Sequence, residues 1–234
     1  MICIQNIKKS FGTKVACDIE SLQIHEGEII GLVGNNGAGK TTLFRILLDL
    51  LKPDNGEVTL KGINVQESEE WKNFTGAYIN EQFLIDYLTP EEFFELLAKI
   101  SGISKDEMKH RLEMFETFDN GELLGNGKLI RNMSAGNKQK IGIISALLTN
   151  PELVILDEPF NFLDPRSQNV IKNILLEYGA KHNATIIISS HNLTHTIDIS
   201  SRILLLENGK VIKDLNKQEN WNVQELEDYF STAE

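Results

Sequence analysis

The stretch Gly34-Asn35-Asn36-Gly37-Ala38-Gly39-Lys40-Thr41 decides the fold, because it fits the pattern G-x-x-x-x-G-K-S/T. The run before it, IIGLV at residues 29–33, is apolar throughout and predicts a strand that is covered on both faces. After it, leucine and isoleucine recur at helical spacing as far as Leu50, and KPDNG at residues 52–56 is a stop signal for a helix. A strand, a glycine-rich loop and a helix in this order indicate an α/β protein.

The loop has the composition of a phosphate-binding site. Its glycines allow successive backbone N–H groups to point at phosphate oxygens, and the N-terminus of the following helix adds partial positive charge. We expect Lys40 to contact the β and γ phosphates of a nucleoside triphosphate, and the Thr41 hydroxyl to ligate magnesium. The loop therefore predicts that the chain binds ATP with Mg²⁺ and hydrolyses the ATP.

Two further strands are expected to end in chemically active side chains. The apolar run LVIL at residues 153–156 is followed by Asp157 and Glu158, and the run TIIIS at residues 185–189 is soon followed by His191. The carboxyl ends of parallel strands lie at one edge of a sheet, so these residues should face the same crevice as the loop. We expect Asp157 to hold the magnesium shell and Glu158 to polarise the attacking water. His191 is expected to lie within reach of the γ-phosphate.

Helix and hairpin signals complete the outline of the sheet. A helix predicted from Pro165 to Tyr178, with Asp164 as its N-cap, separates two of the apolar runs, and this strand–helix–strand order predicts a parallel sheet. A closing hairpin is expected around Asn208-Gly209. The other strand-like runs are expected at residues 2–4, 15–24 and 57–60, and the two arms of the hairpin at 202–206 and 210–212.

The pattern changes to helices between residues 82 and 150. Thr89 and Glu92 form a predicted capping box with proline at the first helical position, and this helix should run to Ile100. Ser104 and Ser134 are expected to open two further helices in the same block. The chain is thus predicted to be one domain, 1–234. Its parts are a core with a β-subdomain at 1–81 and 151–215, a helical subdomain at 82–150 and a C-terminal helical tail at 216–234.

The composition excludes several classes of function. The 234 residues include 23 Lys and Arg against 34 Asp and Glu, a net charge of −11, so nucleic acid is not expected as a main partner. The two cysteines, Cys3 and Cys17, lack CxxC spacing and are expected to be free thiols in a reducing environment. No apolar run reaches the length of a membrane span, so association with a membrane is expected only through a partner.

Taken in order along the chain, the motifs resemble those of the nucleotide-binding domains of the ABC ATPase superfamily. The resemblance covers nearly the whole length, with Asp157 and Glu158 at the Walker B strand and His191 at the switch histidine. It implies a P-loop NTPase core with a mainly parallel sheet, an N-terminal antiparallel β-subdomain and an inserted helical subdomain. The other matches are the phosphate loop at Gly34–Thr42, the signature at Ser134–Asn137, the D-loop at Asn161–Asp164 and the aromatic residue Phe11.

The resemblance also implies a role for each matched residue. Lys40, Glu158 and His191 would be catalytic. Thr41, Asp157 and Glu81 would hold the metal. Phe11 would stack on adenine, and the signature residues would act on the nucleotide of a second copy. The implied nucleotide-binding set is Phe11, Gly34, Asn35, Asn36, Gly37, Ala38, Gly39, Lys40, Thr41, Thr42, Ser134 and Gly136.

Three positions depart from the family pattern. The signature has Ala135 and Asn137 where glycine and glutamine are usual. At the Q-loop, Glu81 falls at the key position, and Gln82 would serve there in a register shifted by one residue. The D-loop has Phe162 where a small residue is common.

For function, the resemblance implies an ATP-hydrolysing subunit that pairs with a second copy, or with a related subunit, and powers a separate transmembrane permease. The Q-loop glutamate and the compact length resemble exporters of drugs and peptides. The expected place is the cytoplasm, at the inner face of the cell membrane. A non-transport ABC ATPase, such as a cluster-assembly ATPase, remains the alternative. A scaffold that only senses nucleotide is disfavoured, because Lys40, Glu158 and His191 are all present.

Overall fold

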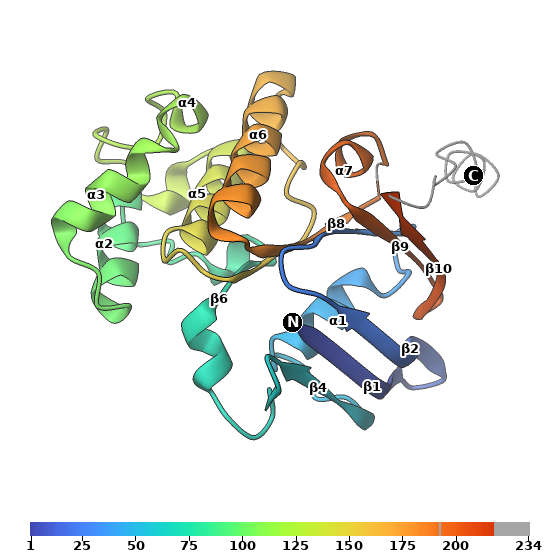
Figure 1. Ribbon diagram of the computed structural model, residues 1–234. Helices are drawn as coiled ribbons and strands as arrows, with labels where there is room; N and C mark the ends of the chain where they lie inside the picture. Colours follow the sequence, from blue (N-terminus) through green and yellow to red (C-terminus); the bar gives the residue numbers. More distant parts are fainter. Residues whose placement is uncertain (192, 218–234) are drawn as a thin grey trace.

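Two β-sheets and the helices around them make up the part of the chain that the structure describes (Figure 1). The computed structural model describes residues 1–191 and 193–217. The helical tail predicted for 216–234 lies outside these residues, apart from its first two positions. The predicted fold class is confirmed: one sheet is mainly parallel, the other is antiparallel, and a block of helices is inserted in the sequence between two neighbouring strands of the mainly parallel sheet.

The larger sheet has six strands in the order β10-β9-β3-β8-β7-β6. The strands from β9 to β6 are parallel, and β10 runs antiparallel to β9. Every residue of β3 and β7 is buried, as their continuous apolar runs predict. The bounds are β3 Ile29–Val33, β6 Thr75–Tyr78, β7 Leu153–Leu156, β8 Thr185–Ser190, β9 Arg202–Glu207 and β10 Lys210–Asn216.

The second sheet has four antiparallel strands in the order β2-β1-β4-β5. Helix α1 (Lys40–Leu47) lies between the two sheets, since its buried side chains share one core with both of them. The prediction from helical spacing that this helix extends to Leu50 is wrong. The helix ends at Leu47, Asp49 has a left-handed backbone, and Leu50 is exposed. The strands are β1 Ile2–Phe11, β2 Lys14–Ile24, β4 Asn55–Leu60 and β5 Ile63–Asn64.

The inserted helices begin where their capping residues predict. Thr89 and Glu92 form the capping box of α2, and the side chains of Ser104 and Ser134 cap α3 and α5. In Figure 1, α2, α3 and α4 lie at the opposite end of the molecule from the hairpin of β9 and β10. The helices are α2 Pro90–Ile100, α3 Lys105–Glu113, α4 Glu116–Asp119, α5 Ala135–Leu147, α6 Pro165–His182 and α7 Leu193–Ile199, with short 3₁₀ turns at Glu70–Phe74, Glu81–Phe83 and Ile130–Asn132.

Two glycines let α5 pack directly on the sheet. A Cβ added at Gly76 of β6 would lie 1.9 Å from the Ala146 carbonyl oxygen, and one added at Gly142 of α5 would lie 2.1 Å from the Tyr78 ring. Neither glycine has a positive φ, so close approach and not backbone conformation requires them. The seam between α5 and β6 therefore has a fixed spacing.

We expect Gly142→Ala to lower the free energy of unfolding by about 1–3 kcal/mol, because the added methyl group overlaps the Tyr78 ring. Gly179→Ala in α6 is the matched control. Its methyl group would meet the flexible end of Ile29 at 3.3 Å, and alanine has the higher helix propensity. Urea denaturation of both variants measures the difference. Equal stability of the two variants would show that the seam is not close-packed.

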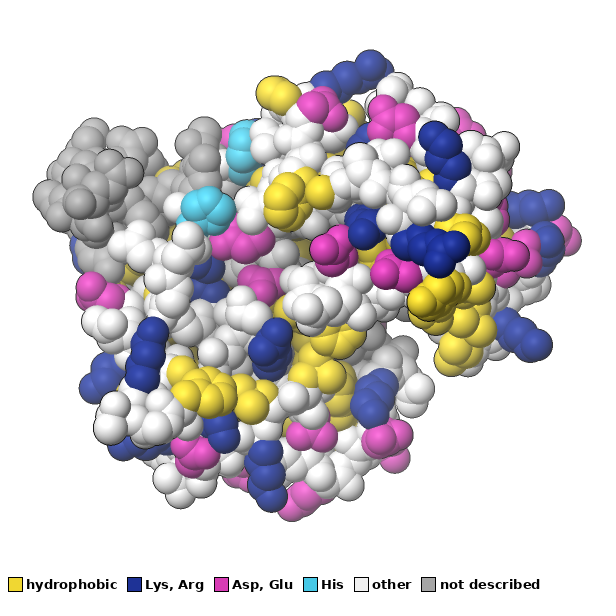
Figure 2. Space-filling view, turned by 180° about the vertical axis from the view of Figure 1, so that it is seen from behind, with side chains coloured by type: hydrophobic (Ala, Val, Ile, Leu, Met, Phe, Trp, Pro, Cys, Tyr) yellow, Lys and Arg dark blue, Asp and Glu magenta, His cyan; other side chains and the backbone are white. Residues whose placement is uncertain are grey.

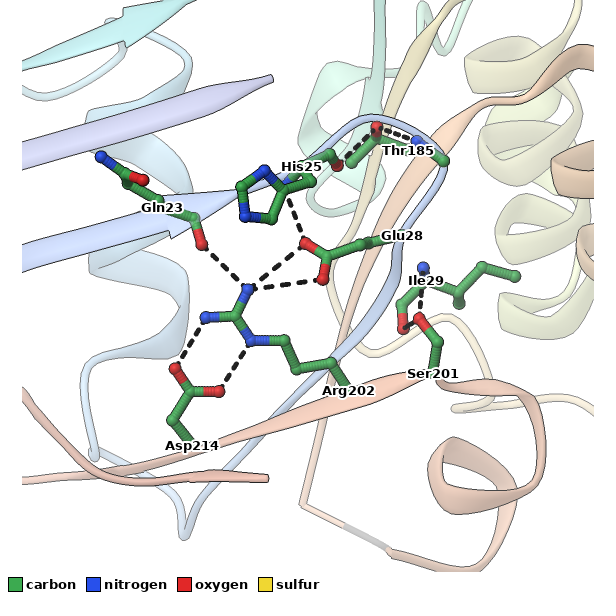
Figure 3. Close-up of polar contacts among 9 residues, drawn as sticks. Gln23, His25, Glu28, Ile29, Thr185, Ser201, Arg202 and Asp214 are labelled. Carbon is green, nitrogen blue, oxygen red and sulfur yellow. Dashed lines mark hydrogen bonds and ion pairs between the residues drawn. The ribbon is translucent and has the colours of Figure 1, made fainter. Parts of the chain in front are cut away.

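Arg202 joins the two sheets at the amino ends of the central strands (Figure 3). Its guanidinium donates two hydrogen bonds of 2.7 Å to Asp214 and one of 2.9 Å to the Gln23 carbonyl, and it lies 3.3 Å from Glu28. These hydrogen bonds and charges raise the pKa of Arg202, so its charge is constant. The turn before β3 is thereby fixed to β9 and β10, at the edge of the sheet opposite the phosphate loop.

Two negative features also bear on function. Both cysteines are free, and burial raises the pKa of the Cys17 thiol to about 12, so this thiol is unreactive at neutral pH. In the described part of the chain, every helix is too short or too polar to cross a lipid bilayer.

Candidate functional site

The glycine-rich loop joins β3 to α1 at the carboxyl edge of the larger sheet. Gly39 has a φ of 111°, a conformation that residues with a side chain rarely adopt, and a Cβ there would lie 2.3 Å from the Ala16 carbonyl oxygen. At Gly34, a Cβ would lie 2.3 Å from the Leu206 carbonyl oxygen. Backbone conformation and close packing together require glycine in this loop.

Lys40 is buried at the first position of α1, with 6% of its surface exposed. Its ammonium group donates a hydrogen bond of 2.5 Å to the Gly34 carbonyl and lies 3.4 Å from Oε1 of Glu158. A positive charge is therefore held inside the curl of the loop, at the N-terminus of a helix. This arrangement favours binding of an anion.

A pocket of about 310 Å³ opens over the loop. Phe11, the last residue of β1, lines it with 54% of its surface exposed, so its ring is available to a planar ligand. Lys14 faces Phe11 across the β1–β2 hairpin and lines the same pocket. Lys14 was not predicted as a site residue, although its position directly after the turn that follows Phe11 indicates that the two side chains are close. The remaining lining residues are Ala16, Asn36, Gly37, Ala38, Gly39, Lys40, Thr41, Thr42 and Glu158.

Thr41 and Asp157 meet beside the pocket. The Thr41 hydroxyl donates a hydrogen bond of 2.6 Å to Asp157, and the Ser189 hydroxyl donates to the other carboxylate oxygen. Burial raises the pKa of Asp157, and these two hydrogen bonds oppose the rise. Hydroxyl and carboxylate oxygens are ligands that Mg²⁺ accepts, so the donor set fits this ion. Ser189 was not predicted as a site residue from the sequence. It follows from the register of β7 and β8, which places it beside Asp157.

Glu158 lies between the loop lysine and the histidine after β8. One carboxylate oxygen is 3.4 Å from Lys40 Nζ, and the other is 2.9 Å from His191 Nδ1. The backbone N–H of Glu158 donates to Ser189 Oγ at 2.8 Å. Glu158 thus contacts one residue from each of two other sequence motifs, Lys40 and His191.

Among the described residues, Glu81 forms an ion pair with Lys138 and has no hydrogen bond with Thr41 or Asp157. Its carboxylate is 3.1 Å from Lys138 Nζ and is largely exposed. Asn80 and Glu81 both line a second pocket, together with Asp157 and Glu158. The Gln82 backbone N–H donates to the Asn80 side chain. The sequence predicted Glu81, or Gln82 in a shifted register, for this position and did not indicate Asn80.

The signature segment is not part of the loop pocket. Ser134 caps α5 by accepting the Asn137 N–H at 3.2 Å, and Gly136 lies so close to the D-loop that a Cβ would be 2.8 Å from the Phe162 carbonyl oxygen. Neither Ser134 nor Gly136 is among the described residues that line the pocket over the loop. Phe162 itself is 73% exposed, with a positive φ of 64°. Within one chain, the signature and the phosphate loop remain separate.

An α/β fold with a buried loop lysine and carboxylates at the ends of parallel strands defines a P-loop nucleotide hydrolase. The family model described as ABC transporter matches residues 17–161, and an AAA-domain model matches residues 125–198. The chain is 34% identical to the bacitracin transport ATP-binding protein BcrA of Enterococcus faecalis over 92% of this chain and 69% of that protein. It is 31% identical to a probable sulfate/thiosulfate import ATP-binding protein CysA of Chlorella vulgaris, over 93% and 92%.

Solved structures agree with these matches. An ATP-binding subunit of an ABC transporter superposes with a TM-score of 0.86 at 26% identity, over 99% of both chains. The dimeric MJ0796 cassette, and its post-hydrolysis state with ADP and Pi, superpose with a TM-score of 0.81 at 25% identity over 92% of this chain and 98% of that chain.

The chain belongs to the ABC transporter ATP-binding family. It is an ATP-binding cassette with ATPase activity. Subunits of this family work with a transmembrane partner and form dimers, as the MJ0796 cassette does.

Proposed function

We propose that this chain hydrolyses ATP with Glu158 as general base and powers a separate membrane-spanning subunit. The observation that carries the assignment is the carboxylate of Glu158, which lies between Lys40 at 3.4 Å and His191 at 2.9 Å. A carboxylate at this place can accept a proton from water as that water attacks the γ-phosphate. Lys40 stabilises the charge on the phosphate, and His191 orients the base.

In the proposed site, Thr41 and Asp157 hold Mg²⁺, and the ion, when bound, supplies charge neutralisation for the phosphates. The described residues contain no group of three histidine, cysteine or carboxylate side chains that could hold a metal. Phosphate and water oxygens would therefore complete the coordination shell. Glu81 is proposed as a further ligand on the resemblance alone, and its ion pair with Lys138 would have to open first.

The other half of the ATP site is proposed to come from a second copy. Ser134 opens α5, and a helix N-terminus is a natural anion site, but it does not line the phosphate pocket of its own chain. Ser134 and Gly136 would then contact the ATP held by the loop of the partner. ATP binding closes the dimer in this scheme, and hydrolysis opens it.

Phe11 is proposed to stack on adenine, because its exposed ring lies at the rim of the phosphate pocket. We expect Phe11→Ala to raise the Kd for ATP about tenfold while kcat changes little, since the lost stacking lies far from the γ-phosphate. Phe11→Trp should keep the affinity. Titration with a fluorescent ATP analogue measures both. An unchanged Kd in Phe11→Ala would contradict the stacking role.

A large groove fits the proposed docking place of the membrane-spanning subunit. It has a volume of about 1000 Å³ and lies between the Glu70–Phe74 turn with β6 on one side and α2 and α3 on the other. Figure 2 shows hydrophobic side chains beside a hollow on the side of the molecule that carries these helices. Ile100 lines the groove with 74% of its surface exposed, and Phe83 lines it with half of its surface exposed. Exposed apolar surface in a groove of this size is typical of a protein interface.

We expect a membrane-spanning subunit to copurify with the chain from gently solubilised membranes, and Ile100→Asp to lose it. Leu176→Asp, at an exposed apolar position on α6, is the matched control and should retain the partner. The ATPase rate of the purified subunit should be the same in both variants. Recovery of non-membrane partners alone would support the alternative, a non-transport ABC ATPase.

Outward movement of the solute is the proposed direction, because the sequence resembles exporters of drugs and peptides. Relatives named for bacitracin transport and for sulfate/thiosulfate import match at 34% and 31% identity, so the direction needs its own measurement. ATP-dependent accumulation in inside-out vesicles would support export. Accumulation in right-side-out vesicles loaded with ATP would establish import. With a membrane-spanning partner, the chain would lie on the cytoplasmic face.

A further inference from the structure

The backbone of Glu158 has an unusual conformation. Its φ is 49°, in the left-handed region that is unfavourable for a residue with a Cβ. Such strain persists where the surrounding contacts hold it, and it fixes the direction of the side chain. The position of the carboxylate between Lys40 and His191 therefore depends on what holds the peptide groups on either side of Glu158.

Three hydrogen bonds hold these peptide groups. The Glu158 N–H donates to Ser189 Oγ at 2.8 Å. The Glu158 carbonyl accepts from the Asn161 N–H at 3.1 Å and from Gln139 Nε2 at 3.1 Å. Asn161 belongs to the same loop as Glu158, whereas Gln139 comes from α5, an element that is packed independently. Gln139 is thus the contact that fixes this carbonyl relative to the rest of the molecule.

Gln139 is itself held firmly. Its side chain is buried, with 6% of its surface exposed, in the second turn of α5. Lys140 next to it pairs with Glu122 at 2.9 Å, and Lys138 pairs with Glu81 at 3.1 Å. Gly142, one turn further along, is in direct contact with Tyr78. The amide of Gln139 is therefore a donor at a fixed position.

We propose that Gln139 is a positioning residue for ATP hydrolysis: its bond to the Glu158 carbonyl maintains the left-handed backbone and directs the carboxylate to Lys40 and His191. The inference rests on the proposed role of Glu158 as general base. It also connects two sites, because Ser134 is the N-cap of α5. The helix that is proposed to face the partner's ATP holds the base of this chain's own ATP site.

The test compares two glutamine variants that lose the same kind of bond. Gln139→Met removes the donor to the Glu158 carbonyl and keeps the side-chain length. Gln168→Met removes the 3.0 Å hydrogen bond from the Gln168 side chain to the Phe160 carbonyl. Phe160 lies in the same loop as Glu158. We expect kcat to fall at least about tenfold in Gln139→Met, with a KM for ATP within about twofold of the parent, because displacing a catalytic group lowers kcat steeply. Gln168→Met should keep both values, and both variants should show similar melting temperatures.

A second variant, Gln139→Asn, tests the positioning role again, and Glu158→Gln tests the proposed function separately. Gln139→Asn retains the amide but is too short to reach, so its kcat should also fall. Equal kcat in Gln139→Met and Gln168→Met would overturn the positioning role. So would a rise in KM at constant kcat. The proposed function fails separately if Glu158→Gln, assayed alongside, hydrolyses ATP at the parent rate.

Discussion

Glu158→Gln is expected to lower kcat for ATP hydrolysis by about 10²–10⁴-fold, the usual contribution of a general base. The variant should still bind ATP, because the amide occupies the same space and removes a negative charge from the vicinity of Lys40 and the phosphates. With binding intact and hydrolysis blocked, the ATP-bound dimer should accumulate. Single-turnover hydrolysis and gel filtration with ATP measure the two effects.

Glu207→Gln is the matched control, because Glu207 is exposed at the end of β9 and is not among the described residues that line the phosphate pocket. It should hydrolyse ATP at the parent rate and form no long-lived dimer. A Glu158→Gln protein with the parent rate would refute the assignment of the base. Loss of ATP binding in the same variant would instead show that Glu158 supports the fold of the pocket.

Lys40→Met is expected to raise the Kd for ATP by at least about 100-fold, since charge-assisted bonds to phosphate are among the strongest that a side chain makes. The nucleotide-free protein should keep its fold, because methionine fills a similar volume and Glu158 retains its contact with His191. In a thermal-shift assay, ATP at about ten times the parent's Kd should therefore raise the Tm of the parent and leave the Tm of the variant nearly unchanged.

Lys52→Met provides the control for loss of one lysine charge, as Lys52 is exposed in the turn after α1. Its Kd and its ATP-dependent rise in Tm should equal those of the parent. If Lys40→Met bound ATP with the parent affinity, the loop would have to bind the phosphates through its backbone alone.

The sequence predicted those parts of the fold that depend on continuous burial or on local capping. Strand β7 was predicted with its observed bounds, because four buried apolar residues in a row leave few alternatives. Capping predicted the starts of α2 and α5, since a cap is a local interaction. Strand β6, with the sequence TGAY, was missed, because its glycine and alanine carry no apolar signal and are explained by the α5 seam.

The site divides in the same way. Lys40, Asp157 and Glu158 lie in linear motifs and could be predicted from spacing. Ser189 could not, because it reaches Asp157 through the register of β7 and β8. Gln139 belongs to a helix that is close to Glu158 only after α5 packs on the sheet. Residues that reach the site through tertiary packing have no signature in a single sequence.

The resting contacts of Lys40 bear on which ligands the pocket selects. Its ammonium group is already bonded to the Gly34 carbonyl and is near the Glu158 carboxylate. An incoming ligand must replace these partners, so a single weak negative charge gains little from the exchange. Several charges on adjacent phosphates gain much more. The affinity of the pocket should therefore rise steeply with the number of phosphates. We expect ATP to bind far more tightly than AMP, and adenosine to bind hardly at all.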